Sequence, residues 1–152
     1  MQKITTFLWF DGKAEEAAKF YVSVFRNSKV LGMNPGPDGK PMLVRFELEG
    51  QEFMALNGGP KFSFTPAISL SVDCQSQQEV DELWDKLTAG GGRSERCGWL
   101  KDKFGLSWQI IPSALGRLMG DPNRAKAGKV MEAMLQMDKI DIAGLQRAYD
   151  QG

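Results

Sequence analysis

The sequence predicts the same order of elements twice in succession: one strand, one helix and then three strands. In the first half these elements are predicted at residues 4–10, 14–25, 29–33, 42–48 and 51–57, and in the second half at 67–73, 76–89, 93–99, 100–103 and 106–111. The two halves correspond at an offset of about 60 residues, which is typical of an internal structural repeat. We therefore expect an α+β fold made of two βαβββ modules.

Apolar spacing supports both predicted helices. Residues on one face of the first helix are apolar at helical spacing, namely Ala14, Ala17, Ala18, Tyr21, Val24 and Phe25. The second helix has the apolar stripe Val80, Leu83, Trp84 and Leu87. Ser76 and Glu79 predict a capping box at its start, and Asp11 and Asp73 are expected to cap the helices that they precede. Asn34 to Pro41 is rich in turn formers and predicts an exposed loop.

Residues 113–152 are predicted to form a helical tail outside the repeat. Asp121 and Pro122 suit the N-cap and first position of one helix, and Asp141 suits the cap of a last helix with Ile142, Leu145 and Tyr149. Ala127, Val130, Met131, Met134 and Met137 follow helical spacing in between. This methionine-rich stripe is either a ligand surface or a face that packs on the sheet or on a second subunit. The predicted organisation is one domain over residues 1–112, with modules at about 1–60 and 61–112, and a helical extension over residues 113–152 of the same domain.

Composition and charge exclude several classes of function. The 152 residues contain 19 Lys and Arg and 19 Asp and Glu, so the formal net charge is zero, unlike that of a nucleic-acid-binding protein. The sequence has no basic run and no long apolar segment, so it does not predict contact with a membrane. We expect a cytoplasmic protein. Cys74 and Cys97 are expected to be free thiols there, the alternative being a disulfide. There is no histidine, so the usual nitrogen ligand of transition metals and the usual general base are missing.

Three segments resemble the PhnB-like branch of the vicinal oxygen chelate superfamily, which includes glyoxalases, extradiol dioxygenases and bleomycin-resistance proteins. They are LWFDGKAEEAAKFYVSVF (residues 8–25), LNGGPKFSFTPAISLSVDC (56–74) and CGWLKDKFGLSWQIIP (97–112). Members of this branch have often been labelled 3-demethylubiquinone-9 3-methyltransferases. The resemblance implies that the two modules form a cupped eight-stranded mixed sheet, commonly in a homodimer, and that active members hold a divalent metal in the cup through His, Gln and Glu.

The positions that the resemblance assigns to metal ligands carry other residue types here. They fall on Thr6, on Leu56 or Asn57, near Ala67 and on Gln109. A hydroxyl, amides and apolar side chains do not replace carboxylate and imidazole donors. We therefore expect no metal and no other cofactor.

Without a metal, the cup would remain as a cleft for a small-molecule ligand, with few polar groups among apolar ones. The candidate ligand-binding residues are Thr6, Leu8, Trp9, Asn57, Trp99, Trp108 and Gln109. The alternative is that the aromatic side chains belong to the core and that Gln109 bonds to a neighbouring strand. No catalytic residue can be named. Cys97 is either a nucleophile or structural, and it has no recognisable base beside it.

Three functions remain open from the sequence. The preferred one is a glyoxalase/bleomycin-resistance-like homodimer that binds a small, partly aromatic molecule without a metal. The alternatives are a superfamily isomerase, lyase or dioxygenase with an atypical site, and a structural or regulatory dimer with a filled cup. Arg96, Lys101 and Lys103 either attract an anionic ligand or form a solvated strand face. A methyltransferase activity is not supported, because Gly90-Gly91-Gly92 follows a helix instead of joining a strand to a helix.

Overall fold

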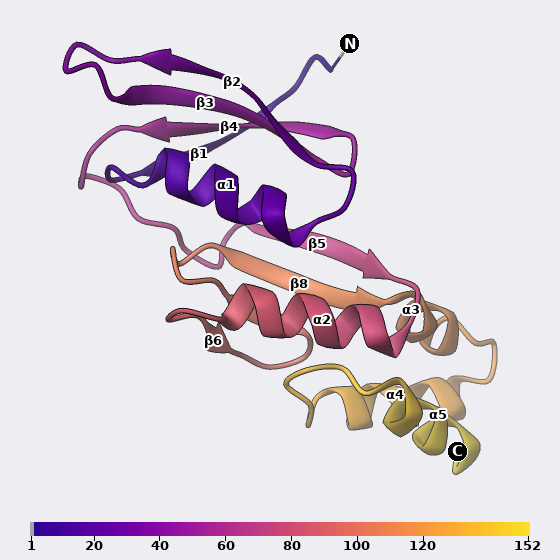
Figure 1. The fold of residues 1–152 in the computed structure, drawn as a ribbon. Coiled ribbons are helices and arrows are strands. Elements are labelled where there is room, and N and C mark those ends of the chain that lie inside the picture. Colours follow the sequence, from indigo (N-terminus) through magenta and orange to yellow (C-terminus); the bar gives the residue numbers. More distant parts are fainter. Residues whose placement is uncertain (1) are drawn as a thin grey trace. The chain divides into compact units, whose positions relative to one another are not determined.

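The computed structural model describes residues 2–152 and contains the predicted repeat (Figure 1). The elements of the first module are β1 (Thr6–Phe10), α1 (Ala14–Val24), β2 (Lys29–Pro35), β3 (Pro41–Leu48) and β4 (Gln51–Asn57). Those of the second are β5 (Ser69–Cys74), α2 (Gln77–Thr88), β6 (Arg93–Ser94), β7 (Trp99–Lys101) and β8 (Ser107–Pro112). The tail consists of α3 (Ser113–Met119), α4 (Arg124–Met134) and α5 (Ile142–Asp150). Contacts divide the chain into two compact units, residues 1–64 and 65–152, and each is described by itself.

Each unit contains a four-stranded mixed sheet with the same strand order. The first sheet runs β1-β4-β3-β2 and the second runs β5-β8-β7-β6. In both, the first and last strands of the module pair in parallel and the remaining pairs are antiparallel. The predicted α+β class and the duplication of the module are therefore confirmed.

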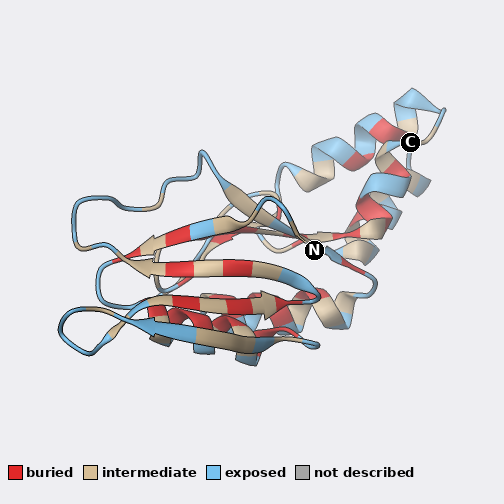
Figure 2. Cartoon of the chain, turned by 90° about the horizontal axis from the view of Figure 1, so that it is seen from above, coloured by how far each residue is buried: buried red, intermediate tan, exposed pale blue. Residues whose placement is uncertain are grey.

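The apolar stripe of each module helix packs on one face of its own sheet. In the first unit Tyr21 of α1 is fully buried and stacks on Phe46 of β3, with ring centroids 6.2 Å apart. In the second unit Val80, Leu83, Trp84 and Leu87 of α2 are all buried, as predicted. Burying one such side chain stabilises the fold by about 2 kcal/mol, so these two stripes fix the helix-covered face of each sheet. Figure 2 shows the resulting alternation of buried and exposed residues along the strands.

Helices α3, α4 and α5 form a small core of their own. Its buried members are Leu115, Leu118, Val130, Ile140 and Leu145. Met134 and Met137 pack against this core, so both belong to the tail's own packing, whereas Met131 is 45% exposed. Ile111 of β8 also contacts the core, which joins the tail to the second sheet.

Several predicted boundaries and caps differ in the structure. The first strand begins at Thr6 instead of Ile4, which is 87% exposed. The loop between β2 and β3 is shorter than predicted, because both strands extend into it and Gly36 N–H donates to Lys40 O at 2.7 Å. Asp73 lies within β5, and Ser76 caps α2 by accepting from Glu79 N–H at 3.1 Å. The cap of α4 is Asn123 instead of Asp121.

The starts of α1 and α5 also differ from the prediction. Asp11 does not cap α1, which begins after Lys13 and has no side-chain cap of its own. Asp141 does occupy the N-cap position of α5, but its side chain accepts no capping hydrogen bond. None of the helices in residues 2–152 combines the length and apolar composition that crossing a bilayer requires.

Candidate functional site

Each sheet has a second face, opposite its module helix, which we call the open face. Leu8 and Phe10 of β1 are buried beneath α1. Because side chains alternate along a strand, Phe7 and Trp9 lie on the open face of the first sheet. Register brings Met54 of β4 beside Phe7 and Leu56 beside Trp9.

The open face of the first sheet is rich in aromatic side chains. Phe7 is 57% exposed, and Phe62, in the segment after β4, is exposed to the same extent. Phe62 meets Trp9 edge to face, with ring centroids 4.9 Å apart. We call Phe7, Trp9, Met54, Leu56 and Phe62 the aromatic platform. Phe7 and Met54 could have been found from strand alternation, whereas no periodic signal marks Phe62.

Trp9 is held rigidly within this platform. Its indole N–H donates to Gly59 O at 2.9 Å, so the polar atom of the ring already has a partner. A Cβ atom at Gly58 would lie 2.4 Å from the Trp9 ring, so the backbone approaches the indole more closely than any other residue type would permit. The Trp9 indole is therefore positioned before any ligand arrives.

Two candidate residues of the first module, Leu8 and Asn57, have structural roles. Leu8 is only 3% exposed, and Thr6 has the same strand parity, so both point toward the helix-covered side. Asn57 Oδ1 accepts from Ala14 N–H at 2.9 Å, and its Nδ2 donates to Pro41 O at 2.8 Å. Asn57 thus caps α1 from the far end of β4, in the place predicted for Asp11.

The open face of the second sheet is polar. Gln109 lies between Trp99 of β7 and Ser71 of β5 in the sheet register. Its Nε2 donates to Ser69 Oγ at 3.0 Å, which is the structural alternative that the sequence left open. Trp99 is partly exposed on this face, and Lys101 lies 4.0 Å from Glu95. Ser107 is fully buried, and its hydroxyl has no hydrogen-bond partner within residues 2–152.

Trp108 belongs to the core instead of an open face. It is 2% exposed, and its indole N–H donates to Asp102 Oδ2 at 2.9 Å. Asp102 is buried to the same extent, and its Oδ1 accepts from the N–H groups of Phe104 and Leu106. These bonds close the turn between β7 and β8, so the placement of Trp108 favours the structural interpretation of this residue.

Both cysteines are free thiols with different surroundings. Burial raises the pKa of Cys74 from 9.0 to about 12, and the carboxylates of Glu79 and Asp73 add to the rise. Cys97 is partly exposed and occupies a turn with φ +60°. Arg96 lies 3.9 Å from Asp138, and Lys103 lies over the ring of Phe104.

The positions that the resemblance assigns to metal ligands offer few donor atoms. Thr6 has the parity of the helix-covered side, Leu56 and Ala67 have apolar side chains, and the amide nitrogen of Gln109 is bonded to Ser69. Among residues 2–152, no three His, Cys, Asp or Glu side chains gather in a group that could hold a metal ion. These residues do not match the donor set that a divalent cation prefers.

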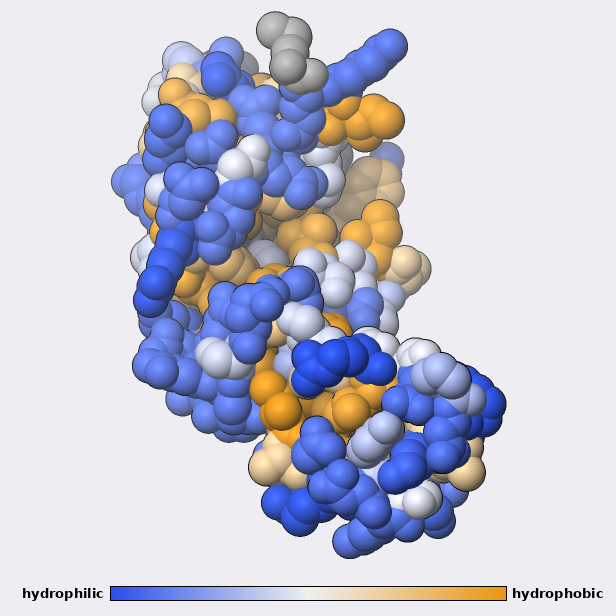
Figure 3. Space-filling view, turned by 90° about the vertical axis from the view of Figure 1, so that its right-hand side faces the viewer, coloured by the Kyte–Doolittle hydropathy of each residue, from blue (hydrophilic) through white to orange (hydrophobic). Residues whose placement is uncertain are grey.

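Exposed apolar groups elsewhere are scattered. Figure 3 shows a mainly hydrophilic surface with small apolar groups between. The exposed large apolar side chains of the described residues are Ile4, Phe7, Met33, Met42, Phe62, Ile68, Met131 and Leu135. Phe7 and Phe62 are the aromatic members of this set, which makes the platform chemically distinct.

The fold is the glyoxalase-like fold. Fosfomycin resistance protein FosX of Listeria monocytogenes, solved with Mn(II) and sulfate, superposes with a TM-score of 0.55 at 15% identity, over 72% of this chain and 89% of that one. Protein PA1353 of Pseudomonas aeruginosa superposes with a TM-score of 0.61 at 20% identity, over 74% of this chain and 98% of that one. These likenesses define the fold class of the chain.

The family follows from closer matches. The model of the 3-demethylubiquinone-9 3-methyltransferase family matches residues 2–111. A putative 3-demethylubiquinone-9 3-methyltransferase, PhnB protein, of Bacillus cereus is 39% identical over 73% of this chain and 99% of that one, with a TM-score of 0.68. No curated protein matches this chain. The chain belongs to the 3-demethylubiquinone-9 3-methyltransferase family, the PhnB-like proteins.

Proposed function

We propose that this protein binds a small, partly aromatic molecule on the open face of its first sheet, without a metal ion. The observation that carries the proposal is the aromatic platform, in which the exposed ring of Phe62 contacts the hydrogen-bonded indole of Trp9 and the exposed ring of Phe7 lies on the same face of β1. Exposed aromatic side chains held in a fixed arrangement offer an aromatic ligand stacking area at little entropic cost. Arg45, beside Met54 in the register, donates from its Nε to Glu52 at 3.4 Å, so a polar ion pair lies at the edge of the platform.

We do not propose a methyltransferase activity, although the family name contains the word. Gly90, Gly91 and Gly92 lie between the end of α2 and the start of β6. A nucleotide-binding glycine turn instead follows a strand and opens a helix. We also propose that the protein acts as a homodimer, as the family resemblance suggests, and light scattering of the purified protein measures the subunit number.

Ligand binding is tested by thermal shift and tryptophan fluorescence with a panel of aromatic antibiotics and aromatic metabolites. A ligand of the native state raises the unfolding midpoint by mass action. We expect Phe7→Ala and Phe62→Ala each to weaken binding about tenfold, the loss of one aromatic contact. Ile4→Ala is the control, because Ile4 is exposed and apolar but lies outside β1.

Two results would overturn the proposal. If no compound shifts the midpoint of the native protein, the structural or regulatory alternative is favoured. If the dialysed protein retains one metal per chain after exposure to nickel, zinc, iron or manganese, and EDTA abolishes binding, the superfamily enzyme with an atypical site is favoured.

A further inference from the structure

Besides α3, which follows β8 directly, a short segment of the tail contacts the second module. This segment is residues 137–142, which we call the strap. The strap joins α4 to α5 and contacts two elements of the module, the start of α2 and the turn between β6 and β7. The family model ends at residue 111, so the strap lies outside the matched part of the chain. The Bacillus cereus protein is 99% covered by a match to 73% of this chain, so it has no counterpart to the remainder.

On one side, the strap holds the β6–β7 turn through the backbone. Cys97 N–H donates to Met137 O, and Gly98 N–H donates to Asp138 O, both at 2.8 Å. Cys97 and Gly98 have φ values of +60° and +83°, and Trp99 N–H donates to Arg96 O at 3.1 Å. Positive φ at both central residues is the mark of a tight two-residue hairpin turn, and it leaves these two N–H groups pointing away from the hairpin.

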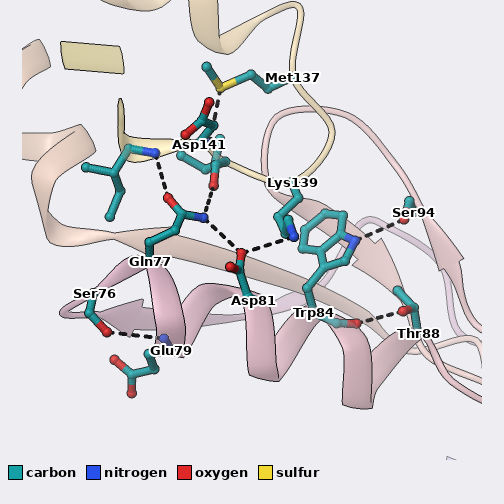
Figure 4. A network of polar contacts seen from close by, with 12 residues as sticks. Ser76, Gln77, Glu79, Asp81, Trp84, Thr88, Ser94, Met137, Lys139 and Asp141 are labelled. Atoms are coloured by element: carbon teal, nitrogen blue, oxygen red, sulfur yellow. Dashed lines mark hydrogen bonds and ion pairs between the residues drawn. The ribbon is translucent and has the colours of Figure 1, made fainter. Parts of the chain in front are cut away.

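On the other side, the strap is held by a side chain, because the amide of Gln77 bonds to two backbone groups of the strap. Its Nε2 donates to Ile140 O at 3.0 Å, and its Oε1 accepts from Ile142 N–H at 2.7 Å. Figure 4 shows Gln77 reaching from the first turn of α2, with Asp81 beside it. The amide therefore satisfies both a carbonyl and an N–H group that the strap would otherwise leave without a protein partner.

Asp81 extends this contact by one turn of α2. Its Oδ1 accepts from Gln77 Nε2 and lies 3.0 Å from Lys139 Nζ of the strap. The Gln77 amide and then Lys139 lower the pKa of Asp81, so its carboxylate is charged at neutral pH. The charge orients the Gln77 amide toward the strap, because the amide nitrogen has to face the carboxylate.

The hairpin that the strap holds is short and lies at the edge of its sheet. Strand β6 has two residues and β7 has three, with β6 as the outermost strand. So few ladder bonds give little local stability. Trp99 and Lys101, both on β7, are carried on this hairpin.

We propose that the strap is a clasp that closes the β6–β7 hairpin and fixes Trp99 on the open face of the second sheet, and that Gln77 is the positioning residue that keeps the clasp closed. Opening the strap frees the Cys97 and Gly98 N–H groups, and the hairpin with Trp99 moves more freely. The clasp does not depend on the proposed function, because Trp99 belongs to the second unit and the aromatic platform to the first.

The sequence offers a matched pair of variants. Gln78 is the next residue on α2, and like Gln77 it donates to a carboxylate four residues on, from its Nε2 to Glu82 at 3.2 Å. Only Gln77 also reaches the strap. Gln77→Met therefore removes the clasp contact, and Gln78→Met removes a comparable exposed helix contact while leaving the strap bonded.

Amide hydrogen exchange of the full chain tests the clasp directly. We expect Gln77→Met to accelerate exchange of the Cys97 and Gly98 amides about tenfold, and Gln78→Met to leave them unchanged. The Asp102 amide donates to Leu106 O at 2.9 Å between two buried residues of the second module, so it reports unfolding of that module and should be unaffected by either change. Equal exchange at Cys97 and Gly98 in the two variants would overturn the proposal.

A second variant covers the case in which Gln77→Met also accelerates exchange of the Asp102 amide. Lys139→Met breaks the ion pair from the tail side without altering α2, and we expect an acceleration of about threefold at Cys97 and Gly98 alone. No acceleration there would also overturn the clasp.

The mobility of Trp99 completes the test. We expect broadened Trp99 indole signals in nuclear magnetic resonance spectra of Gln77→Met relative to Gln78→Met. Unchanged Trp99 signals would overturn the role of the clasp in fixing Trp99.

Discussion

The indole N–H of Trp108 donates to the carboxylate of Asp102 at 2.9 Å, and both side chains are 2% exposed. The same carboxylate accepts from two backbone N–H groups of the β7–β8 turn. Asp102→Asn turns an acceptor into a donor facing the indole, so we expect it to lower the free energy of unfolding by about 2 kcal/mol.

The pair can be isolated with a double-mutant cycle measured by urea unfolding. Trp108→Phe removes the indole donor, and in that background Asp102→Asn should cost clearly less. Additive effects of the two substitutions would show that the bond does not couple these residues.

Asn57 is predicted to contribute to the stability of the fold and not to the binding of a ligand. Asn57→Ala removes the acceptor for Ala14 N–H and the donor for Pro41 O, and we expect a loss of about 2 kcal/mol in chemical denaturation. Any screened ligand should bind the folded variant as it binds the native protein. A loss of affinity with unchanged stability would instead place Asn57 in the site.

Gly58 and Gly128 should respond to alanine in opposite directions. Gly58→Ala places a Cβ atom 2.4 Å from the Trp9 ring, so the indole must leave Gly59 O. We expect a loss of about 2 kcal/mol and a shift in tryptophan emission. Gly128 lies within α4 with nothing near its Cβ position, and Gly128→Ala should raise stability by about 0.5–1 kcal/mol. A neutral Gly58→Ala would mean that Trp9 is not fixed.

Cys74 is predicted to link stability to alkaline pH. Its pKa is 9.0 in the unfolded reference and about 12 in the fold, so the folded state keeps its proton longer as pH rises. Stability is then full below pH 9.0 and falls between pH 9.0 and about 12. Thermal unfolding across this range should show a slope that Cys74→Ala reduces. Below pH 9, a thiol reagent should modify Cys97 and spare Cys74, and rapid modification of both in the native protein would contradict the buried placement.

The sequence predicted the module repeat well because its signals are local. Helical spacing identified the buried stripe of α2 residue by residue, and the capping box placed its start at Ser76. Strand alternation places Met42, Val44, Phe46 and Leu48 on one side of β3, and the last three are buried, whereas Met42 is 43% exposed. Each of these depends on residues close together in the chain.

The candidate site was less predictable, because a periodic pattern separates two faces of a strand without saying which face the helix covers. The sequence selected Thr6, Leu8 and Trp9 on β1, whereas burial beneath α1 leaves Trp9 and the unselected Phe7 on the open face. Phe62 joins Trp9 from a segment with no regular structure. The placement of a ligand on either face stays a prediction.

By itself the sequence determined the order of elements, the apolar faces of the helices and the absence of histidine. Only the tertiary structure decided that Asn57 caps α1 from 43 residues away and that Gln77 holds Ile142 from 65 residues away. An amide can bond to any donor or acceptor within about 3 Å. Its partner is therefore set by where the fold brings the backbone, and no local pattern records that.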